Sequence, residues 1–196
     1  MPRPRTRRRA WTLAAATTAL ATALAAAPAV MTTATANEGN PTVLAWGAGR
    51  TGQIGNGTLS DSLSPTSVTS LFRGDVDQMS VGGTSSADSF ALARTDTTVK
   101  AWGNNSSGQL GNGGTTNQTV PTTVPRLTNI KDTAAGGRHA LALDTSGQVY
   151  SWGANAAAQL GDGTTTAQVT PTTALPPGSG VTRVATTVTG KSAFAY

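Results

Sequence analysis

Short apolar stretches recur along the chain, and segments rich in Gly, Thr, Ser and Asn separate them. The clearest series lies between residues 130 and 174 and comprises Ile130–Ala135, His139–Leu143, Val149–Trp152 and Thr172–Ala174. Asp144–Gly147 has the composition of a hairpin turn, and Gln159–Gly163 has that of a tight turn. Pro171 is expected at the start of the fourth stretch, where a missing N–H costs least. The pattern predicts an antiparallel meander of four short strands.

This unit recurs along the chain. A Trp-Gly pair ends one apolar strand in each copy, and a Gln-x-Gly-x-Gly turn begins seven residues after the Trp. The recurring residues are Trp46, Gly47, Gln53, Gly55 and Gly57; Trp102, Gly103, Gln109, Gly111 and Gly113; and Trp152, Gly153, Gln159, Gly161 and Gly163. A second block, Val76–Gly83, matches Ile130–Gly137, and Val181–Tyr196 is a weaker copy. Four short strands in roughly 50 residues are typical of a propeller blade.

The repeat carries a long motif. Val99–Gly113 fits V-x-x-W-G-x-N-x-x-G-Q-L-G-x-G almost residue for residue, and Ile130–Leu143 fits V-x-x-V-A-x-G-x-x-H-x-L-A-L. This motif resembles the repeat signature of the regulator-of-chromosome-condensation family, in which Gly136, Gly137 and His139 also have a place. The resemblance implies a β-propeller, usually of seven blades, and a structural role for His139. We therefore expect residues 37–196 to form an all-β domain of about three such blades in a secreted bacterial member of the family.

The blades at the two ends are expected to be incomplete. The first repeat element, Val43–Trp46, corresponds to a third strand, and the last, ending at Tyr196, corresponds to a second strand. The chain therefore predicts two whole blades and two complementary halves. An open arc of blades exposes apolar faces and strand edges. Two outcomes are open: a homodimer that completes a six-blade ring, or the incomplete ring of a truncated propeller.

The first 36 residues have the composition of an export signal. Five arginines in the first nine residues precede an uncharged stretch, Trp11–Met31, and Ala34-Thr35-Ala36 follows. This order predicts a bacterial signal peptide cleaved after Ala36 and a secreted protein. Arg8-Arg9 also resembles a twin-arginine signal. An uncleaved membrane anchor is the alternative, although the richness in Ala and Thr argues against it.

Removal of the leader changes the charge balance. The remaining residues carry nine basic and nine acidic side chains, so the high pI of the whole chain gives no support to nucleic-acid binding. No membrane association is expected after cleavage. The chain has no cysteine, which excludes disulfides, a thiolate nucleophile and a cysteine zinc site.

Few residues suggest chemistry. Gly47–Gly52 fits G-x-G-x-x-G, but turn residues follow it where a dinucleotide site needs a helix. His139 is the single histidine and could serve as a general base with Ser192 or an Asp, against the structural role implied by the family. Asp75 and Asp77 form the one close acidic pair. Ligand stacking and packing between blades are both conceivable for the aromatic set Trp46, Trp102 and Trp152. We predict no catalytic, metal-binding or cofactor-binding residue.

The expected function is protein binding without catalysis. Propellers present variable turns at the ends of fixed strands. Here these turns are small and polar: Ser60–Ser64, Thr84–Asp88 and Thr115–Thr119. The alternatives are an envelope-associated structural protein or truncated fragment, and an extracellular enzyme or enzyme inhibitor. The last alternative rests on similar propellers that include a secreted β-lactamase inhibitory protein and a lyase.

Overall fold

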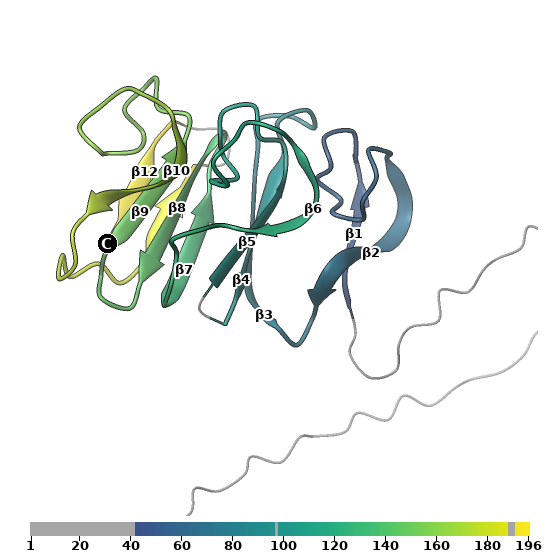
Figure 1. Ribbon diagram of the computed structural model, residues 1–196, viewed down its shortest axis with the longest axis horizontal. Coiled ribbons are helices and arrows are strands. Elements are labelled where there is room, and N and C mark those ends of the chain that lie inside the picture. The colour runs from purple at the N-terminus through teal and green to yellow at the C-terminus, as the bar shows by residue number, and fades with distance from the viewer. Residues whose placement is uncertain (1–41, 97, 188–190) are drawn as a thin grey trace, which may run out of the picture. The chain divides into compact units, whose positions relative to one another are not determined.

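The computed structural model describes residues 42–96, 98–187 and 191–196, which form an all-β fold (Figure 1). The expected signal peptide, residues 1–36, and its cleavage site at Ala36 lie outside the described residues. The described part contains the strands β1 (Thr42–Gly47), β2 (Ser62–Phe72), β3 (Val76–Gly82), β4 (Phe90–Thr95), β5 (Thr98–Gly103), β6 (Gln118–Thr123), β7 (Ile130–Ala135), β8 (His139–Asp144), β9 (Val149–Gly153), β10 (Gln168–Leu175), β11 (Val184–Thr186) and β12 (Ala193–Ala195). No helix in this part is long and apolar enough to cross a membrane.

The strands form four antiparallel sheets. Two sheets are complete meanders of four strands, β3-β4-β5-β6 and β7-β8-β9-β10. The other two contain only two strands each, β1-β2 and β11-β12. The prediction of an all-β fold built from propeller blades is thus confirmed, with two whole blades and two half-blades forming an incomplete ring.

The core lies between the faces of successive sheets. One cluster joins Phe90 and Leu92 of β4 to Ala140 of β8 and Trp152 of β9, in the next sheet. A second cluster joins Leu141 of β8 to the β11 region, and a third packs β2 against β4 and β5. Every residue of β8 is buried, because a central strand has a sheet on each of its faces. Each blade is therefore stabilised mainly by its neighbours.

The innermost strands of three successive sheets are joined through Asp132 on β7. Its carboxylate accepts hydrogen bonds from the Gln78 amide of β3 at 2.8 Å and from the backbone N–H of Val184 of β11 at 3.0 Å. The Arg183 guanidinium forms an ion pair with the same group at 3.1 Å. One buried carboxylate thus fixes the spacing of three neighbouring sheets.

The first three strands of the meander begin where the sequence predicted, and the fourth is longer than expected. β10 begins at Gln168, so Pro171 lies inside the strand and not at its start. The pairing of β10 with β9 is irregular between Gln168 and Thr172, around this proline. Pro65 in β2 and Pro121 in β6 lie at the same kind of irregularity. Proline lacks an N–H, and a bulge on an outer strand is where the pairing does not need that donor.

Candidate functional site

Two of the three repeated tryptophans lie between neighbouring sheets. Trp102 and Trp152 are almost completely buried. The indole N–H of Trp102 donates to the carbonyl oxygen of Gln53 at 3.1 Å, and that of Trp152 donates to the carbonyl of Gln109 at 2.9 Å. Each tryptophan thereby ties its own sheet to the tight turn of the preceding one. Packing between blades, one of the two roles considered from the sequence, describes both residues.

Glycine in the tight turn leaves room for the indole. Gly55 and Gly111 have positive φ values of 75° and 66°. A side-chain carbon added to either glycine would lie 2.7 Å from the indole nitrogen, Nε1 of Trp102 or of Trp152 respectively. Any larger residue would displace the tryptophan. This contact therefore requires glycine at the turn position that meets the tryptophan of the following repeat.

The third tryptophan differs from the other two. The side chain of Trp46 is 64% exposed, and no sheet among the described residues covers it. At the other end of the repeats, Gly161 occupies the turn position of Gly55 and Gly111. A carbon added there would have only the Ala174 methyl within 4.0 Å. Packing between blades therefore does not describe Trp46 in the single chain.

The repeated glutamines fold the loop that follows each Trp-Gly pair. The side-chain oxygen of Gln109 accepts a hydrogen bond from the Ser107 N–H at 2.8 Å, and the side-chain oxygen of Gln159 accepts one from the Ala157 N–H at 2.9 Å. The equivalent bond of Gln53 comes from Thr51 at 2.9 Å. Six further signature glycines have positive φ and end the strand or close the turn: Gly47, Gly103 and Gly153; Gly57, Gly113 and Gly163.

Two buried asparagines that the sequence prediction did not assign to a site hold the same loops. The Asn105 amide nitrogen donates to the carbonyls of Gly114 and Thr116 at 3.0 and 3.1 Å, and its oxygen accepts from the Leu110 N–H at 2.9 Å. Asn155 makes the equivalent bonds in the next sheet. Both stand three residues after a tryptophan, so their shared offset was the signal that could have identified them. The first repeat has Gly49 at this offset, packed directly on the Ser60 carbonyl.

His139 is not arranged for catalysis. Its side chain is completely buried at the start of β8, and neither ring nitrogen has a hydrogen-bond partner among the described residues. Burial lowers the pKa of His139, because the protonated ring would lose its hydration. Gly136 lies directly against the ring, while Ser192, the suggested partner, is exposed and forms no hydrogen bond with it. The structure does not bring these residues together as a catalytic pair.

The other candidate groups also lie apart. Asp77 forms an ion pair with Arg94 at 2.9 Å, and the backbone N–H of Asp75 donates to the Phe72 carbonyl in the turn between β2 and β3. Within the described ranges, Gly47–Gly52 leads into a tight turn and not into a helix. No group of three or more His, Cys, Asp or Glu that could hold a metal occurs in the part of the chain described by the structure.

The predicted variable turns lie at one end of the strands, although β2 already begins at Ser62 and β6 at Gln118, inside two of the predicted turns. β3 and β5 run in the same direction because both pair antiparallel with β4, so the loops after them emerge at one edge. Contacts between sheets extend this edge: the Gln53 amide donates to the Ser86 carbonyl at 2.7 Å, and the Gly113 N–H donates to the Val169 carbonyl at 2.9 Å. We call the surface formed by residues 48–61, 83–89, 104–117, 136–138 and 154–167 the loop face.

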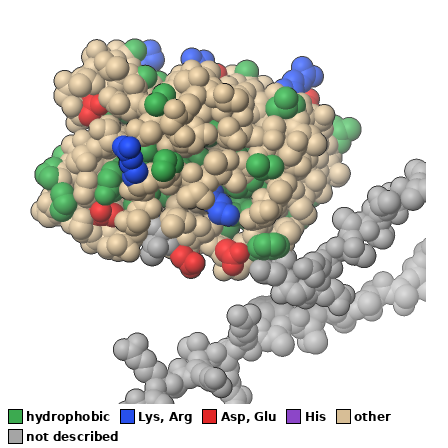
Figure 2. Space-filling view, in the orientation of Figure 1, with side chains coloured by type: hydrophobic (Ala, Val, Ile, Leu, Met, Phe, Trp, Pro, Cys, Tyr) green, Lys and Arg blue, Asp and Glu red, His purple; other side chains and the backbone are tan. Residues whose placement is uncertain are grey.

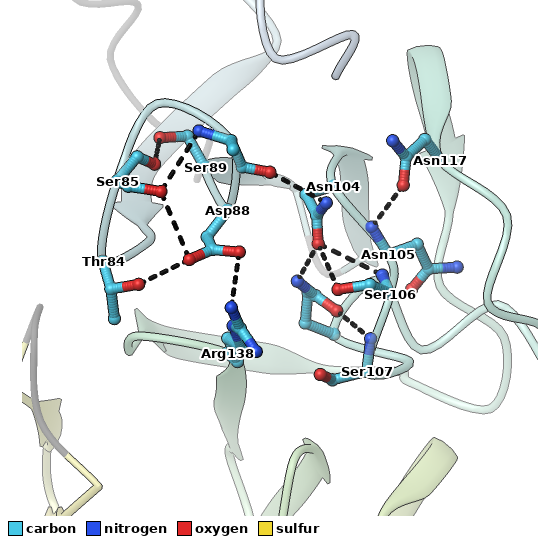
Figure 3. A network of polar contacts seen from close by, with 12 residues as sticks. Thr84, Ser85, Asp88, Ser89, Asn104, Asn105, Ser106, Ser107, Asn117 and Arg138 are labelled. Carbon is cyan, nitrogen blue, oxygen red and sulfur yellow. Dashed lines mark hydrogen bonds and ion pairs between the residues drawn. The ribbon is translucent and has the colours of Figure 1, made fainter. Parts of the chain in front are cut away.

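An ion pair between sheets lies at the centre of the loop face. The Asp88 carboxylate accepts from the Thr84 hydroxyl at 2.5 Å and pairs with the Arg138 guanidinium of the next sheet at 2.8 Å (Figure 3). The Thr84 hydrogen bond, followed by the bond from Arg138, lowers the pKa of Asp88 below its ordinary value. Asn104 holds the adjoining loop through bonds to Ser106 at 2.9 and 3.1 Å. The loops are therefore held in one arrangement by hydrogen bonds within and between sheets.

A shallow polar cavity opens beside this ion pair. Small side chains and two cationic groups line it: Thr84, Ser106, Ser107, Arg138, Ala154, Ala156, Thr165 and Lys191. Charged groups are few and scattered on the view in Figure 2, where most of the visible surface is backbone and small polar side chains. The cavity offers hydroxyl and guanidinium donors but no carboxylate or imidazole base, and this set is suited to binding.

Comparison with known proteins places these repeats. Residues 42–87, 98–143 and 146–190 match the model of the regulator of chromosome condensation (RCC1) repeat, and residues 130–159 match a second model of this repeat. The chain belongs to the RCC1 repeat family. The family predicted from the tryptophan and glycine motifs is thus confirmed, and the family matches include all three Trp-Gly pairs.

Other RCC1-repeat proteins are similar over about half of this chain. The ultraviolet-B receptor UVR8 of Arabidopsis thaliana is 35% identical over 111 residues, which are 55% of this chain and 24% of that protein. The human E3 ubiquitin-protein ligase HERC2 is 35% identical over 54% of this chain and 2% of its own length. The human probable E3 ubiquitin-protein ligase HERC6 is 40% identical over 54% of this chain and 10% of its own length. The matched RCC1 segment thus spans at most about a quarter of these relatives.

Solved structures show the same fold. Yeast RCC1 (Prp20) bound to Kap60 superposes with a TM-score of 0.63 at 18% identity, over 72% of this chain and 35% of that one. Prp20p of Saccharomyces cerevisiae, characterised for its binding to Gsp1p and histones, superposes with a TM-score of 0.61 at 18% identity, over 79% and 39%. At this identity the likeness establishes the RCC1 propeller fold and not a shared partner.

Proposed function

We propose that this chain is a secreted protein-binding module whose partner docks on the loop face. The observation that carries the proposal is the set of hydrogen bonds that holds this face: buried amides order the loops at 104–117 and 154–167, and the Asp88–Arg138 pair joins two sheets. A surface ordered before contact loses little conformational entropy when a partner binds. The relative captured with Kap60 is a protein-binding member of the same family, which supports the assignment.

The binding proposal is tested with two arginine variants of the mature protein. Arg138 lies on the loop face, and Arg73 lies in the turn between β2 and β3 at the opposite end of the strands. A pull-down from culture supernatant with residues 37–196 should recover a protein that Arg138→Ala captures poorly and Arg73→Ala captures as wild type does. Equal capture by both variants would place the partner elsewhere.

Catalysis is not part of the proposed function. His139 is the single histidine of the chain and is buried without a partner for either ring nitrogen. The described residues that line the loop-face cavity supply hydroxyls, amides and cations, which suit the binding of anionic or polar groups. Nucleic-acid binding is not part of the proposed function either, since basic and acidic residues are equal in number after the leader.

Export is proposed from the basic and apolar leader. Signal peptidase cleavage after Ala36 would leave Asn37 as the first residue of the mature protein. N-terminal sequencing of protein recovered from the culture medium should begin at Asn37. Recovery of the protein only from the membrane fraction, with its leader intact, would favour the anchor.

The proposed active form is a dimer. Two whole blades and two half-blades in each copy would give two chains six blades in all. Light scattering on the mature protein should therefore give twice the mass of one chain. A stable monodisperse monomer would reject this assembly without affecting the binding proposal.

A further inference from the structure

The two half-blades supply different halves of one blade. β1 carries the Trp-Gly pair found at the ends of β5 and β9, so β1 and β2 correspond to the third and fourth strands of a meander. β11 and β12 follow the fourth strand of the preceding sheet and correspond to the first and second strands. β12 pairs with β11 alone, and its other edge is open among the described residues.

A groove beside β12 has the shape that holds a tryptophan elsewhere in the chain. Its walls are formed by the turn at Leu160 and Gly161, the β8 and β10 side chains Leu141 and Ala174, and Ala193 of β12. In the two preceding sheets the same turn position, Gly55 or Gly111, contacts an indole. At Gly161 no described residue supplies one. The backbone carbonyl of Gln159 corresponds to those of Gln53 and Gln109, which accept an indole N–H.

A second groove lies beside β1 and has the complementary character. Trp46 and Val81 are 64% and 60% exposed, and with Met79 they line an apolar hollow over β4. In the whole blades the second strand fills this position. Phe194 of β12 is 54% exposed and corresponds to Leu141, which packs on the following sheet. Each half-blade therefore exposes the aromatic side chain that the groove beside the other lacks.

We propose that β1 of a second copy pairs with the open edge of β12 and inserts its Trp46 against Gly161. The pairing of β8 with β9, Ala140 with Trp152 and Leu141 with Ser151, defines the register. Ala193 then faces Trp46 of the second copy, and Phe194 faces Ala45. The Trp46 indole N–H donates to the Gln159 carbonyl, and Phe194 enters the groove beside β1.

This inference rests on the proposed dimer and assigns the residues that join it. A two-fold operation forms the joint twice, since each copy gives one β1 and one β12. The joint adds backbone hydrogen bonds along a strand edge, and the aromatic pockets supply the specificity. Other occupants of the grooves would not place residues 45 and 194 of two copies side by side.

The absence of cysteine permits a direct test by cross-linking. The Asp144 N–H donates to the Gln148 carbonyl and the Ala154 N–H to the Arg138 carbonyl, so Leu141 and Ser151 form a pair without hydrogen bonds between them. Side chains approach most closely in such pairs, at a distance that suits a disulfide. The double variant Ala45→Cys, Phe194→Cys reproduces this pair at the proposed joint.

Air oxidation of the double variant should give a covalent species of twice the chain mass on a non-reducing gel. Within one chain, β1 and β12 lie at opposite ends of the series of sheets and are not in contact (Figure 1). The matched control is Leu63→Cys, Phe194→Cys, because Leu63 is fully exposed on β2, the strand that pairs with β1 and is separated by it from β12 in the proposed joint. The control should stay monomeric on the gel.

The outcomes separate the joint from the dimer. If the wild type scatters light as a dimer but the double variant does not cross-link, the joint is wrong and the dimer stands. If the wild type is a monomer and nothing cross-links, both are wrong. As an independent measurement, Trp46→Ala should weaken self-association by roughly thirtyfold, as expected for a central aromatic anchor, and Leu63→Ala should leave it unchanged. Equal association of the two variants would overturn the role of Trp46.

Discussion

At the scale of single residues, the loops depend on buried amides more than on charges. Asn105 is completely buried and uses its side chain to satisfy the backbone groups of a long loop. Buried backbone groups that lose their partners cost free energy, because water cannot replace the bond. The polar interior of each loop is thus a folding requirement as well as a feature of the loop face.

Removal of the Asn105 amide should destabilise the fold. We expect Asn105→Ala to lower the free energy of unfolding by about 2 to 3 kcal/mol, since three backbone groups lose their partner. Asn56→Ala removes a half-buried amide that bonds only Thr58 and should cost less than about 1 kcal/mol. Urea denaturation of both variants measures the difference, and equal midpoints would contradict it.

Burial of His139 should make stability depend on pH. The folded pKa is lowered, whereas the unfolded imidazole takes up a proton near pH 6.5, so below about this pH the unfolded state binds more protons. The free energy of unfolding should therefore fall as the pH is lowered from 7 to 5. Since His139 is the one histidine, His139→Leu should remove this slope. Persistence of the slope in the variant would assign it to another group.

Recurrence in the sequence identified most residues of the repeat and could not identify their surroundings. Trp102 and Trp152 have the same motif as Trp46, and the local pattern gives all three the same environment. Only the presence of a preceding sheet makes an indole buried, and this is a property of neighbours in space. Asn105 has a place in the repeat motif, but the sequence does not show that its side chain is buried, because an asparagine after a strand is also typical of an exposed turn.

At the scale of elements, the predicted strands were accurate where apolar residues are continuous. β7 and β8 begin at the predicted residues, since both are buried on nearly every position. β10 was underestimated because outer strands are half exposed and mix Thr, Gln and Pro, a composition shared with loops. The bulge that accommodates Pro171 has no signal in apolar periodicity.

The tight turn gives a test of the contact between sheets. Gly111 and Gly113 both have positive φ, so alanine should strain either position by about 1 kcal/mol. Only Gly111 contacts an indole, and Gly111→Ala should cost a further 1 to about 3 kcal/mol as Trp152 is displaced. Thermal or urea unfolding of the two variants should show this order. The reverse order would mean that the turn tolerates an altered indole position.

At the scale of the whole molecule, the sequence predicted the number and kind of blades because each copy of the repeat motif corresponds to one meander. The grooves beside β1 and β12 could not be predicted, since they arise from side chains of several strands. The structure adds that the two grooves are complementary. Trp46 is exposed at β1 and suits the groove beside β12, and Phe194 is exposed at β12 and suits the groove beside β1.

Self-association should be visible in the fluorescence of the mature chain. Its tryptophans are Trp46, Trp102 and Trp152, of which only the first is exposed in a single copy. Acrylamide should quench one indole readily in dilute protein and poorly in concentrated protein, where Trp46 is covered. Trp46→Phe should abolish the concentration dependence. Quenching that is independent of concentration in the wild type would contradict the coverage of Trp46.

The prolines of the outer strands restrict how these molecules can meet. Pro65, Pro121 and Pro171 each interrupt the periphery of a blade, where an unbroken row of N–H groups would attract foreign strands and seed fibrils. Association at the periphery is thereby discouraged, while the open edges of β1 and β12 carry no such interruption. At high concentration the protein should therefore remain dispersed as small closed particles, because the two edges left open for strand pairing can satisfy each other.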